Sequence, residues 1–185
     1  MMRRDTPCIF AQFCRMNRRH FIGLGGNMGD RHALLDSALN EIQCAWPYVQ
    51  EHSGRFETPA WGMAPGTPAF LNQVISVALP GSIEPLHVLE TLLAIEQKLG
   101  RHRSAKADGY QSRSIDLDLL AVEGVQMETA ALTLPHPRMH LRRFVLAPLA
   151  ELAPELALTA GGPSVAELLR TCADQSAVQR LESTP

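Results

Sequence analysis

Two aspartates one residue apart, Asp116 and Asp118, lie in the apolar stretch 113–120 and could bind metal ions. In a strand, alternate side chains point to the same face, so both carboxylates would share one surface while Leu117 and Leu119 face the other. At a same-face spacing of roughly 7 Å, they could hold a pair of Mg²⁺ ions, which prefer oxygen ligands and suit a phosphate-bearing substrate. The plainer alternative is one polar face of a half-buried sheet.

Three arginines precede this aspartate pair and could supply positive charge to phosphates. Phosphoryl transfer needs such cations, because its catalysis is mostly positioning and charge stabilisation. The chain has no Walker A motif, and Met28 stands where a dinucleotide-binding loop would have its third glycine. ATP, if bound, must therefore be held by metals and side-chain cations. The side chains that could serve are Arg101, Arg103, Arg113, His136 and Arg142.

Several further segments accompany the aspartate stretch in a fixed order along the chain. They are the turn 23–30, Phe70-Leu71-Asn72, Ile95-Glu96 with Leu99-Gly100-Arg101, Leu134-Pro135-His136-Pro137-Arg138, and the segment 142–146. In this order and at these separations they resemble the 6-hydroxymethyl-7,8-dihydropterin pyrophosphokinase family, over residues 20–158. The resemblance implies an enzyme of tetrahydrofolate biosynthesis that transfers pyrophosphate from ATP to the pterin hydroxymethyl group, with AMP leaving.

The resemblance also implies roles at the phosphate end of the site. Asp116 and Asp118 would bind a pair of Mg²⁺ ions that bridge the ATP phosphates, and Arg101 and Arg113 would be catalytic residues on a mobile closing loop. Tyr110-Gln111-Ser112 stands where the family commonly has Trp-Gly-Pro, so we expect Tyr110 to stack and the loop to be more flexible without proline. The expected ATP-binding residues are Glu96, Arg101, Arg103, Tyr110, Arg113, His136 and Arg142.

A flat, hydrogen-bonding pterin ring needs aromatic faces and an amide at its edge. By resemblance, Phe70 and Phe144 form the stacking pair and Asn72 reads the ring edge. Core packing is the plainer alternative for the two phenylalanines, but Asn72 lies between apolar neighbours and would need polar partners if buried. The other residues expected at the pterin are Thr58, Pro59 and Trp61.

The hydrophobic periodicity predicts a β-α-β-β-α-β order of elements. Strands are expected at 21–24, 48–58, 69–79 and in the aspartate stretch, with helices that begin at Asp30 and Pro85. This order is typical of the ferredoxin-like α+β fold, an antiparallel sheet backed by helices. C-terminal additions should include a helix that begins near Arg143 and another through 165–169, after which the tail frays.

Length and composition predict one domain. A chain of 185 residues, 45% of them hydrophobic, can bury one sizeable core but not two ordinary ones. We expect a disordered extension at residues 1–19, a pyrophosphokinase domain at 20–158, and a C-terminal helix and tail at 159–185. The first twenty residues are rich in arginine and carry only a short apolar run, which favours translation from Met16 over a targeting peptide.

The formal charge of −2 lacks the basic excess that nucleic acids and anionic membranes select, so neither partner is expected. The four cysteines have no C-x-x-C spacing, which favours a reducing cytoplasm over a disulfide framework or a zinc site. No apolar stretch approaches the length of a membrane span. We expect a cytoplasmic monomer whose partners are ATP and the hydroxymethyl-dihydropterin.

Two other classes of protein are compatible with parts of the pattern. A Mg²⁺-dependent phosphohydrolase or nucleotidyl transferase could use the aspartate pair, but it would not require Phe70, Asn72 and Phe144 to form a pterin-sized slot. A non-catalytic ferredoxin-like binding module is the third possibility, since this fold hosts many functions.

Overall fold

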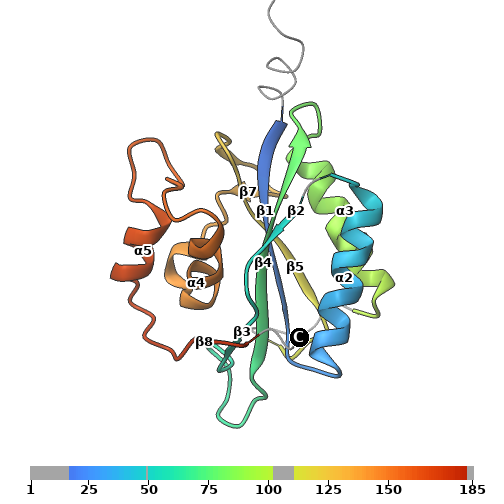
Figure 1. Ribbon diagram of the computed structural model, residues 1–185, viewed down its shortest axis with the longest axis vertical. Helices are drawn as coiled ribbons and strands as arrows, with labels where there is room; N and C mark the ends of the chain where they lie inside the picture. Colours follow the sequence, from blue (N-terminus) through green and yellow to red (C-terminus); the bar gives the residue numbers. More distant parts are fainter. Residues whose placement is uncertain (1–16, 49, 102–110, 183–185) are drawn as a thin grey trace, which may run out of the picture.

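A computed structural model describes residues 17–48, 50–101 and 111–182 of the chain. Its centre is an antiparallel sheet with the strand order β5-β1-β4-β3-β8, in which β2 also pairs with β4 (Figure 1). The strands of this sheet are β1 (Asn17–Gly26), β2 (Gln50–His52), β3 (Phe56–Thr58), β4 (Phe70–Pro80), β5 (Asp116–Val122) and β8 (Gln179–Arg180). A separate hairpin joins β6 (Met127–Glu128) to β7 (Thr133–Leu134).

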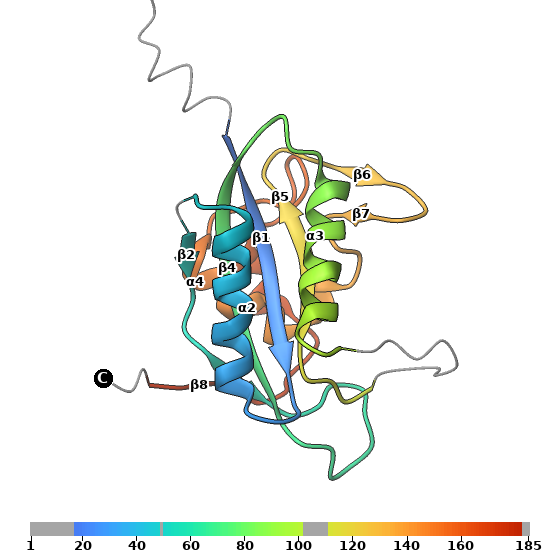
Figure 2. The ribbon, with the colours of Figure 1, turned by 90° about the vertical axis from the view of Figure 1, so that its right-hand side faces the viewer.

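Helices cover both faces of the sheet (Figure 1). On one face α2 (Arg31–Ala45) and α3 (Pro85–Lys98) lie side by side, as Figure 2 shows. On the other face, the 3₁₀ turn η1 (Met139–Leu141) leads into α4 (Arg143–Leu152), and α5 (Val165–Thr171) packs against α4. The element order and the strand order confirm the predicted ferredoxin-like α+β fold with C-terminal additions.

Strand alternation divides the apolar side chains into two cores. On β1, Ile22 and Leu24 face the first pair of helices and pack in one buried cluster with Leu35 of α2 and Leu92 of α3. Phe21 faces the other way and belongs to the cluster beneath α4. Full burial of a side chain of this size contributes roughly 1.5–3 kcal/mol. Both cores therefore hold β1, the strand between β4 and β5, in place.

Local signals explain where the first two helices begin and where the second ends. The Asp30 carboxylate accepts a hydrogen bond from the Ala33 N–H at 3.0 Å and caps α2. Pro85 stands at the start of α3, where its missing N–H is harmless. Gly100, with φ at 83°, takes the left-handed conformation that commonly ends a helix.

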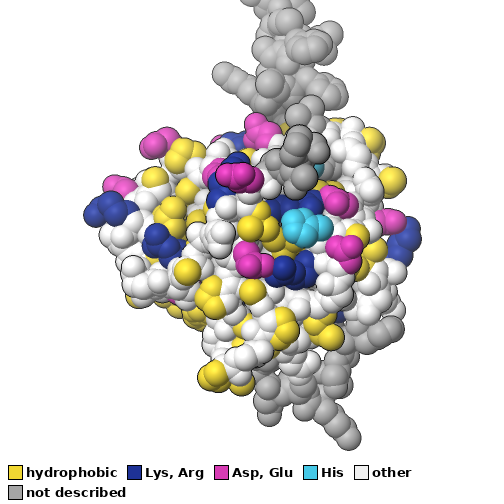
Figure 3. All heavy atoms as spheres, turned by 60° about the horizontal axis from the view of Figure 1, so that its bottom comes forward, with side chains coloured by type: hydrophobic (Ala, Val, Ile, Leu, Met, Phe, Trp, Pro, Cys, Tyr) yellow, Lys and Arg dark blue, Asp and Glu magenta, His cyan; other side chains and the backbone are white. Residues whose placement is uncertain are grey.

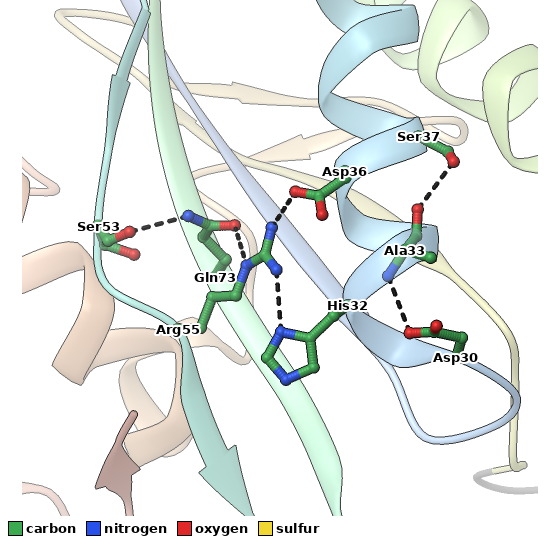
Figure 4. Close-up of polar contacts among 8 residues, drawn as sticks. All are labelled: Asp30, His32, Ala33, Asp36, Ser37, Ser53, Arg55 and Gln73. Carbon is green, nitrogen blue, oxygen red and sulfur yellow. Dashed lines mark hydrogen bonds and ion pairs between the residues drawn. The ribbon is translucent and has the colours of Figure 1, made fainter. Parts of the chain in front are cut away.

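The strand expected over 48–58 is divided into β2 and β3. The break occurs at Ser53, whose hydroxyl accepts a hydrogen bond from the Val74 N–H at 3.0 Å in place of a regular strand contact. Beyond the break, the Arg55 guanidinium reaches α2, where it pairs with the Asp36 carboxylate and donates to His32 Nδ1 at 3.0 Å (Figure 4). These contacts join the start of β3 to the first turns of α2.

Both ends of the sheet differ from the boundaries expected from the sequence. β1 begins at Asn17, so residues 17–19 belong to the sheet and not to the extension placed at 1–19, because β4 is long enough to pair with them through residues 78–80. At the other end, the expected helix lies at Val165–Thr171. Residues 179–180 then pair with β3, where a fraying tail was expected.

The end of the molecule where α2 begins carries side chains of both charges. Figure 3 shows basic, acidic and histidine side chains close together on this face, without a large area of one sign. No helix in the described part of the chain is both long and apolar enough to cross a membrane.

Candidate active site

The candidate site is a cleft between the sheet and the start of α4. Its floor is made by β1, β4 and β5, and its walls by the loop after β3 and by the junction of η1 with α4. Residues from several of the segments that the sequence singled out meet here, although they are far apart in the sequence; Glu96, Arg101 and His136 are not among the lining residues. The described residues of the sequence-based site that line it are Thr58, Pro59, Trp61, Phe70, Asn72, Arg113, Asp116, Asp118, Arg142 and Phe144.

Glycines on β1 leave room above the floor next to the two aspartates. Gly25 lies opposite Asp116 and Gly23 opposite Asp118 in the antiparallel register of β1 with β5. A Cβ atom on Gly25 would lie 3.0 Å from Oδ1 of Asn72. The alternation of glycine on β1 with aspartate on β5 therefore keeps the carboxylates and the Asn72 amide open to one space.

Asp116 is surrounded by charged side chains. Arg101 contacts Oδ1 of Asp116 and also Oε1 of Glu96, while Nη2 of Arg113 lies 2.7 Å from Oδ2 of Asp116. Glu96 Oε1 accepts a further hydrogen bond from the Leu117 N–H at 2.7 Å. Glu96 of α3 therefore orients Arg101 and also anchors the start of β5, between the two aspartates.

Asp118 has a different electrostatic setting from Asp116. Burial and the neighbouring charge of Asp116 raise the pKa of Asp118 to about 6, although the positive charges of Arg142 and Arg113 act in the opposite direction. A carboxylate in this setting gains from a cation that neutralises it. The pair of Asp116 and Asp118 therefore favours the binding of additional positive charge.

His136 lies next to β5 but outside the cleft lining. Its backbone N–H donates to the Leu120 carbonyl at 2.7 Å, and its Nδ1 accepts from the Arg138 N–H at 3.3 Å. Burial, followed by the charges of Arg142 and Arg138, lowers the pKa of His136 to about 4. His136 is therefore a neutral hydrogen-bonding group near pH 7, and not the cation that the sequence suggested.

The aromatic side of the cleft contains Trp61 as well as the two expected phenylalanines, Phe70 and Phe144. The ring centroids of Trp61 and Phe144 are 6.3 Å apart, and the Arg142 guanidinium lies 5.6 Å from the first and 5.7 Å from the second. Phe70 instead faces Arg113, at 5.5 Å. The Trp61 ring therefore forms part of the aromatic wall beside Phe144.

Asn72 has the polar partner that a buried amide needs. Its Nδ2 donates to the Thr58 hydroxyl at 2.8 Å, and the residue is 6% exposed. Oδ1 of Asn72 faces Gly25 and the open cleft. This arrangement leaves the amide oxygen available to a ligand.

Two residues expected at the nucleotide, Arg103 and Tyr110, lie outside the described residues. The sequence interpretation also missed some lining residues that the structure brings into the cleft, among them Gly23, Gly25 and Met63. The two glycines could have been found from their alternate spacing in a strand that must face the aspartate strand.

Comparisons with known proteins agree with this geometry. The family model of 7,8-dihydro-6-hydroxymethylpterin-pyrophosphokinase (HPPK) matches residues 21–154. A 2-amino-4-hydroxy-6-hydroxymethyldihydropteridine pyrophosphokinase of Methylorubrum extorquens is 39% identical over 166 residues, which are 89% of this chain and 99% of the relative. The enzyme of the same name from Bacillus subtilis is 37% identical over 142 residues, 76% of this chain and 81% of that one.

A solved structure supports the fold. A crystal structure of Plasmodium falciparum HPPK-DHPS superposes with a TM-score of 0.61 at 13% sequence identity, over 83% of this chain. The match spans 43% of the length of that solved chain, and it bears on the fold alone. The family match and the identity to full-length relatives show more: the chain belongs to the 7,8-dihydro-6-hydroxymethylpterin-pyrophosphokinase family.

Proposed function

We infer that the cleft binds ATP and 6-hydroxymethyl-7,8-dihydropterin together and that its residues carry out the reaction of the family. The chain is a pyrophosphokinase of folate biosynthesis, which transfers the pyrophosphoryl group of ATP to the hydroxymethyl group of the pterin. One observation carries the assignment to this cleft. Asp116 and Asp118 open onto the same space as Phe70, Asn72 and Phe144, so charge-binding and ring-binding groups are side by side.

Asp116 and Asp118 are the residues that would hold Mg²⁺. Among the residues that the structure describes, no three histidine, cysteine, aspartate or glutamate side chains cluster as a complete metal cage. Two carboxylates fit Mg²⁺ nevertheless, because this ion is commonly held by one or two carboxylates, with substrate phosphates and water as its other ligands. When bound, a pair of Mg²⁺ ions would neutralise phosphate charge and make the hydroxymethyl proton easier to lose.

The arginines around Asp116 suit the nucleotide end of the cleft. Arg101 and Arg113 are placed within reach of the aspartates and would bind the phosphates as the transferred group accumulates charge. Glu96 would orient Arg101 as it does here. Neutral His136 would serve as a hydrogen-bonding group. Arg142, together with Arg103 and Tyr110, completes the proposed nucleotide-binding set.

The aromatic end suits the pterin. Phe70, Trp61 and Phe144 offer ring faces to a flat heterocycle, and the free side of the Asn72 amide can bind the ring edge. Thr58 holds Asn72 in the orientation that leaves Oδ1 free, and Pro59 continues the same wall. The carboxylates among the described lining residues are Asp116 and Asp118, and we assign no separate general base.

The proposal also covers the domain bounds, the partners, the oligomeric state and the compartment of the enzyme. We assign the activity to residues 20–158 and regard residues 159–185 as an addition to that domain. The net charge of −2 supports small molecules rather than nucleic acids as partners, and the cysteine spacing supports a reducing cytoplasm; the proposed oligomeric state is a monomer. Light scattering of the purified chain would test the monomer.

A product assay tests the function. The protein is incubated with Mg²⁺, ATP and hydroxymethyl-dihydropterin, and the nucleotide and pterin products are separated. AMP and pterin diphosphate should appear in equal amounts. ADP, or phosphate released without change to the pterin, would indicate a phosphohydrolase, and an absence of nucleotide turnover would indicate a binding module. Asp118→Asn is the matched variant, since it keeps the shape of the side chain and should lose turnover.

A further inference from the structure

Asn27 lies behind the cleft, where three segments of the chain meet. It follows the last residue of β1 and is 4% exposed. Its side chain bonds to the loop 59–69, which leads into Phe70 and is called the pterin-binding loop below, and to the segment 111–115, which carries Arg113 and is called the arginine segment. The residue does not line the cleft, so its contribution to the site must come through other residues.

The Asn27 side-chain amide forms hydrogen bonds with both segments. Its Nδ2 donates to the Pro68 carbonyl at 3.1 Å and to the Ser112 hydroxyl at 3.0 Å. Its Oδ1 accepts from the Arg113 N–H at 2.9 Å, and its own backbone N–H donates to the Arg113 carbonyl at 3.0 Å. Both amide hydrogens and the carbonyl oxygen are therefore engaged, which only a carboxamide of this length could achieve.

Two further contacts show that the same junction is tightly built. A Cβ atom on Gly26 would lie 2.2 Å from the Ser114 carbonyl oxygen, so the backbones of β1 and the arginine segment touch. On the cleft side, the Arg113 guanidinium packs on the Phe70 ring. The two segments are thus connected twice. Arg113 contacts Phe70 in the cleft, and Asn27 bonds to both segments outside the cleft lining.

We propose that Asn27 is a positioning residue that fixes the distance between the pterin-binding loop and the arginine segment. The inference rests on the proposed function, because these loops carry the groups assigned to the two substrates. Transfer between two bound substrates requires the reacting atoms to be aligned, and a misplacement of about 1 Å can cost on the order of 100-fold in rate. Binding of either substrate alone does not require that alignment.

The prediction is therefore a loss of turnover without an equal loss of binding. Asn27→Ala should lower kcat on the order of 100-fold, while the KM values for ATP and pterin and the calorimetric affinity of each substrate alone change by less than about fivefold. Asn27→Asp tests the contacts of Asn27 with the two segments separately. A carboxylate can still accept from the Arg113 N–H but opposes the Pro68 carbonyl, so this variant should weaken pterin binding more than ATP binding.

Asp30→Ala is the matched control for stability. Asp30 lies in the same turn and caps α2 through the Ala33 N–H, as Figure 4 shows, but among the described residues it makes no hydrogen bond or ion pair with either loop. Its loss should lower the melting temperature through the lost helix cap while leaving kcat within about twofold of the unmodified protein.

The outcomes distinguish this inference from the proposed function. If the unmodified protein makes no AMP and pterin diphosphate, the proposed function fails. If it does so and Asn27→Ala keeps a kcat within about threefold of Asp30→Ala, Asn27 is merely structural and the inference is overturned. Equal losses in kcat and in the affinity for both substrates would overturn it as well, since they would show a collapsed site rather than a misaligned one.

Discussion

Arg113 bridges the two ends of the cleft: its guanidinium carbon lies 5.5 Å from the centre of the Phe70 ring, and its Nη2 lies 2.7 Å from the Asp116 carboxylate. One side chain thus contacts the aromatic wall and the proposed metal-binding carboxylate at once. A cation held between a ring and a carboxylate is already ordered, so little conformational entropy remains to be lost when it meets a phosphate.

Arg113→Ala should therefore lower kcat strongly and change ATP affinity little. Loss of a charge that stabilises mainly the transition state commonly costs about 3 kcal/mol, or on the order of 100-fold in rate. Single-turnover rates and equilibrium binding of a non-hydrolysable ATP analogue would be measured together. Arg170→Ala removes an exposed arginine on α5 and serves as the control for net charge. Equal losses in binding and rate would instead make Arg113 an ordinary nucleotide anchor.

Asp118 should make the metal-free protein less stable near neutral pH than its amide counterpart. Its pKa is raised from 3.8 to about 6 in the fold, chiefly by burial and then by Asp116. Between these values the folded state binds more protons than the unfolded state, so this group's contribution to stability falls as pH rises from about 4 to 6. Asp118→Asn removes that cost and should stabilise the protein by on the order of 1–3 kcal/mol above pH 7.

Urea denaturation in a metal chelator would measure this difference at several pH values. The gain from Asp118→Asn should be largest above about pH 7 and should disappear as pH falls below about 4, where the aspartate becomes protonated in both states. A variant that is less stable than the unmodified protein above pH 7, or equally stabilised at every pH, would contradict the assigned cause.

Gly25→Ala tests whether the space between β1 and the Asn72 amide is needed for pterin binding. The new methyl group would lie 3.0 Å from Oδ1 of Asn72, which is tighter than ordinary contact, so the amide must shift away from its Thr58 partner. The KM for the pterin should rise on the order of tenfold, or about 1.4 kcal/mol, with a smaller change for ATP. Gly23→Ala meets mainly the flexible end of Leu120, at 3.3 Å, and should have a milder effect. The reverse order would show that Asn72 does not read the pterin.

The sequence predicted the parts of the fold that have a local cause. Asp30 begins α2 and Pro85 begins α3 through contacts within one helical turn, and the alternation around Asp116 placed two carboxylates on one face. The break in the second strand occurs where the Ser53 hydroxyl accepts from the Val74 N–H, and these two residues are 21 apart in the sequence. No local sequence pattern predicts a contact between residues that are so far apart in the chain.

The same limit applies to the site. Asn27 follows a glycine turn and reads as a loop residue, because its partners Pro68 and Ser112 lie 41 and 85 residues further along the chain. Charge assignments failed for a related reason. His136 was interpreted as a cation from its type, but its burial beside Arg142 and Arg138 keeps it neutral, and burial is a property of the folded chain.

The C-terminal strand β8 joins the pterin end of the cleft to α4. It pairs with Phe56 and Glu57 of β3, which directly precede Thr58. The Arg180 side chain also forms an ion pair with Glu151 of α4 at 2.7 Å. Glu151 also accepts from the Gly54 N–H at 2.7 Å, so one carboxylate holds the start of β3 and β8 together.

Deletion of residues 176–185 should therefore weaken pterin binding and leave ATP binding nearly unchanged. The loss of two backbone pairings and a surface ion pair should lower the free energy of unfolding by about 1–2 kcal/mol. Because β3 would then be a three-residue edge strand, Thr58 should hold Asn72 less firmly, and the KM for the pterin should rise several-fold. Glu151→Gln, which loses the charge but keeps the chain, should give a smaller change in the same direction. Faster hydrogen exchange at Phe56 and Glu57 without any change in pterin KM would show that β8 stabilises the sheet but does not support the site.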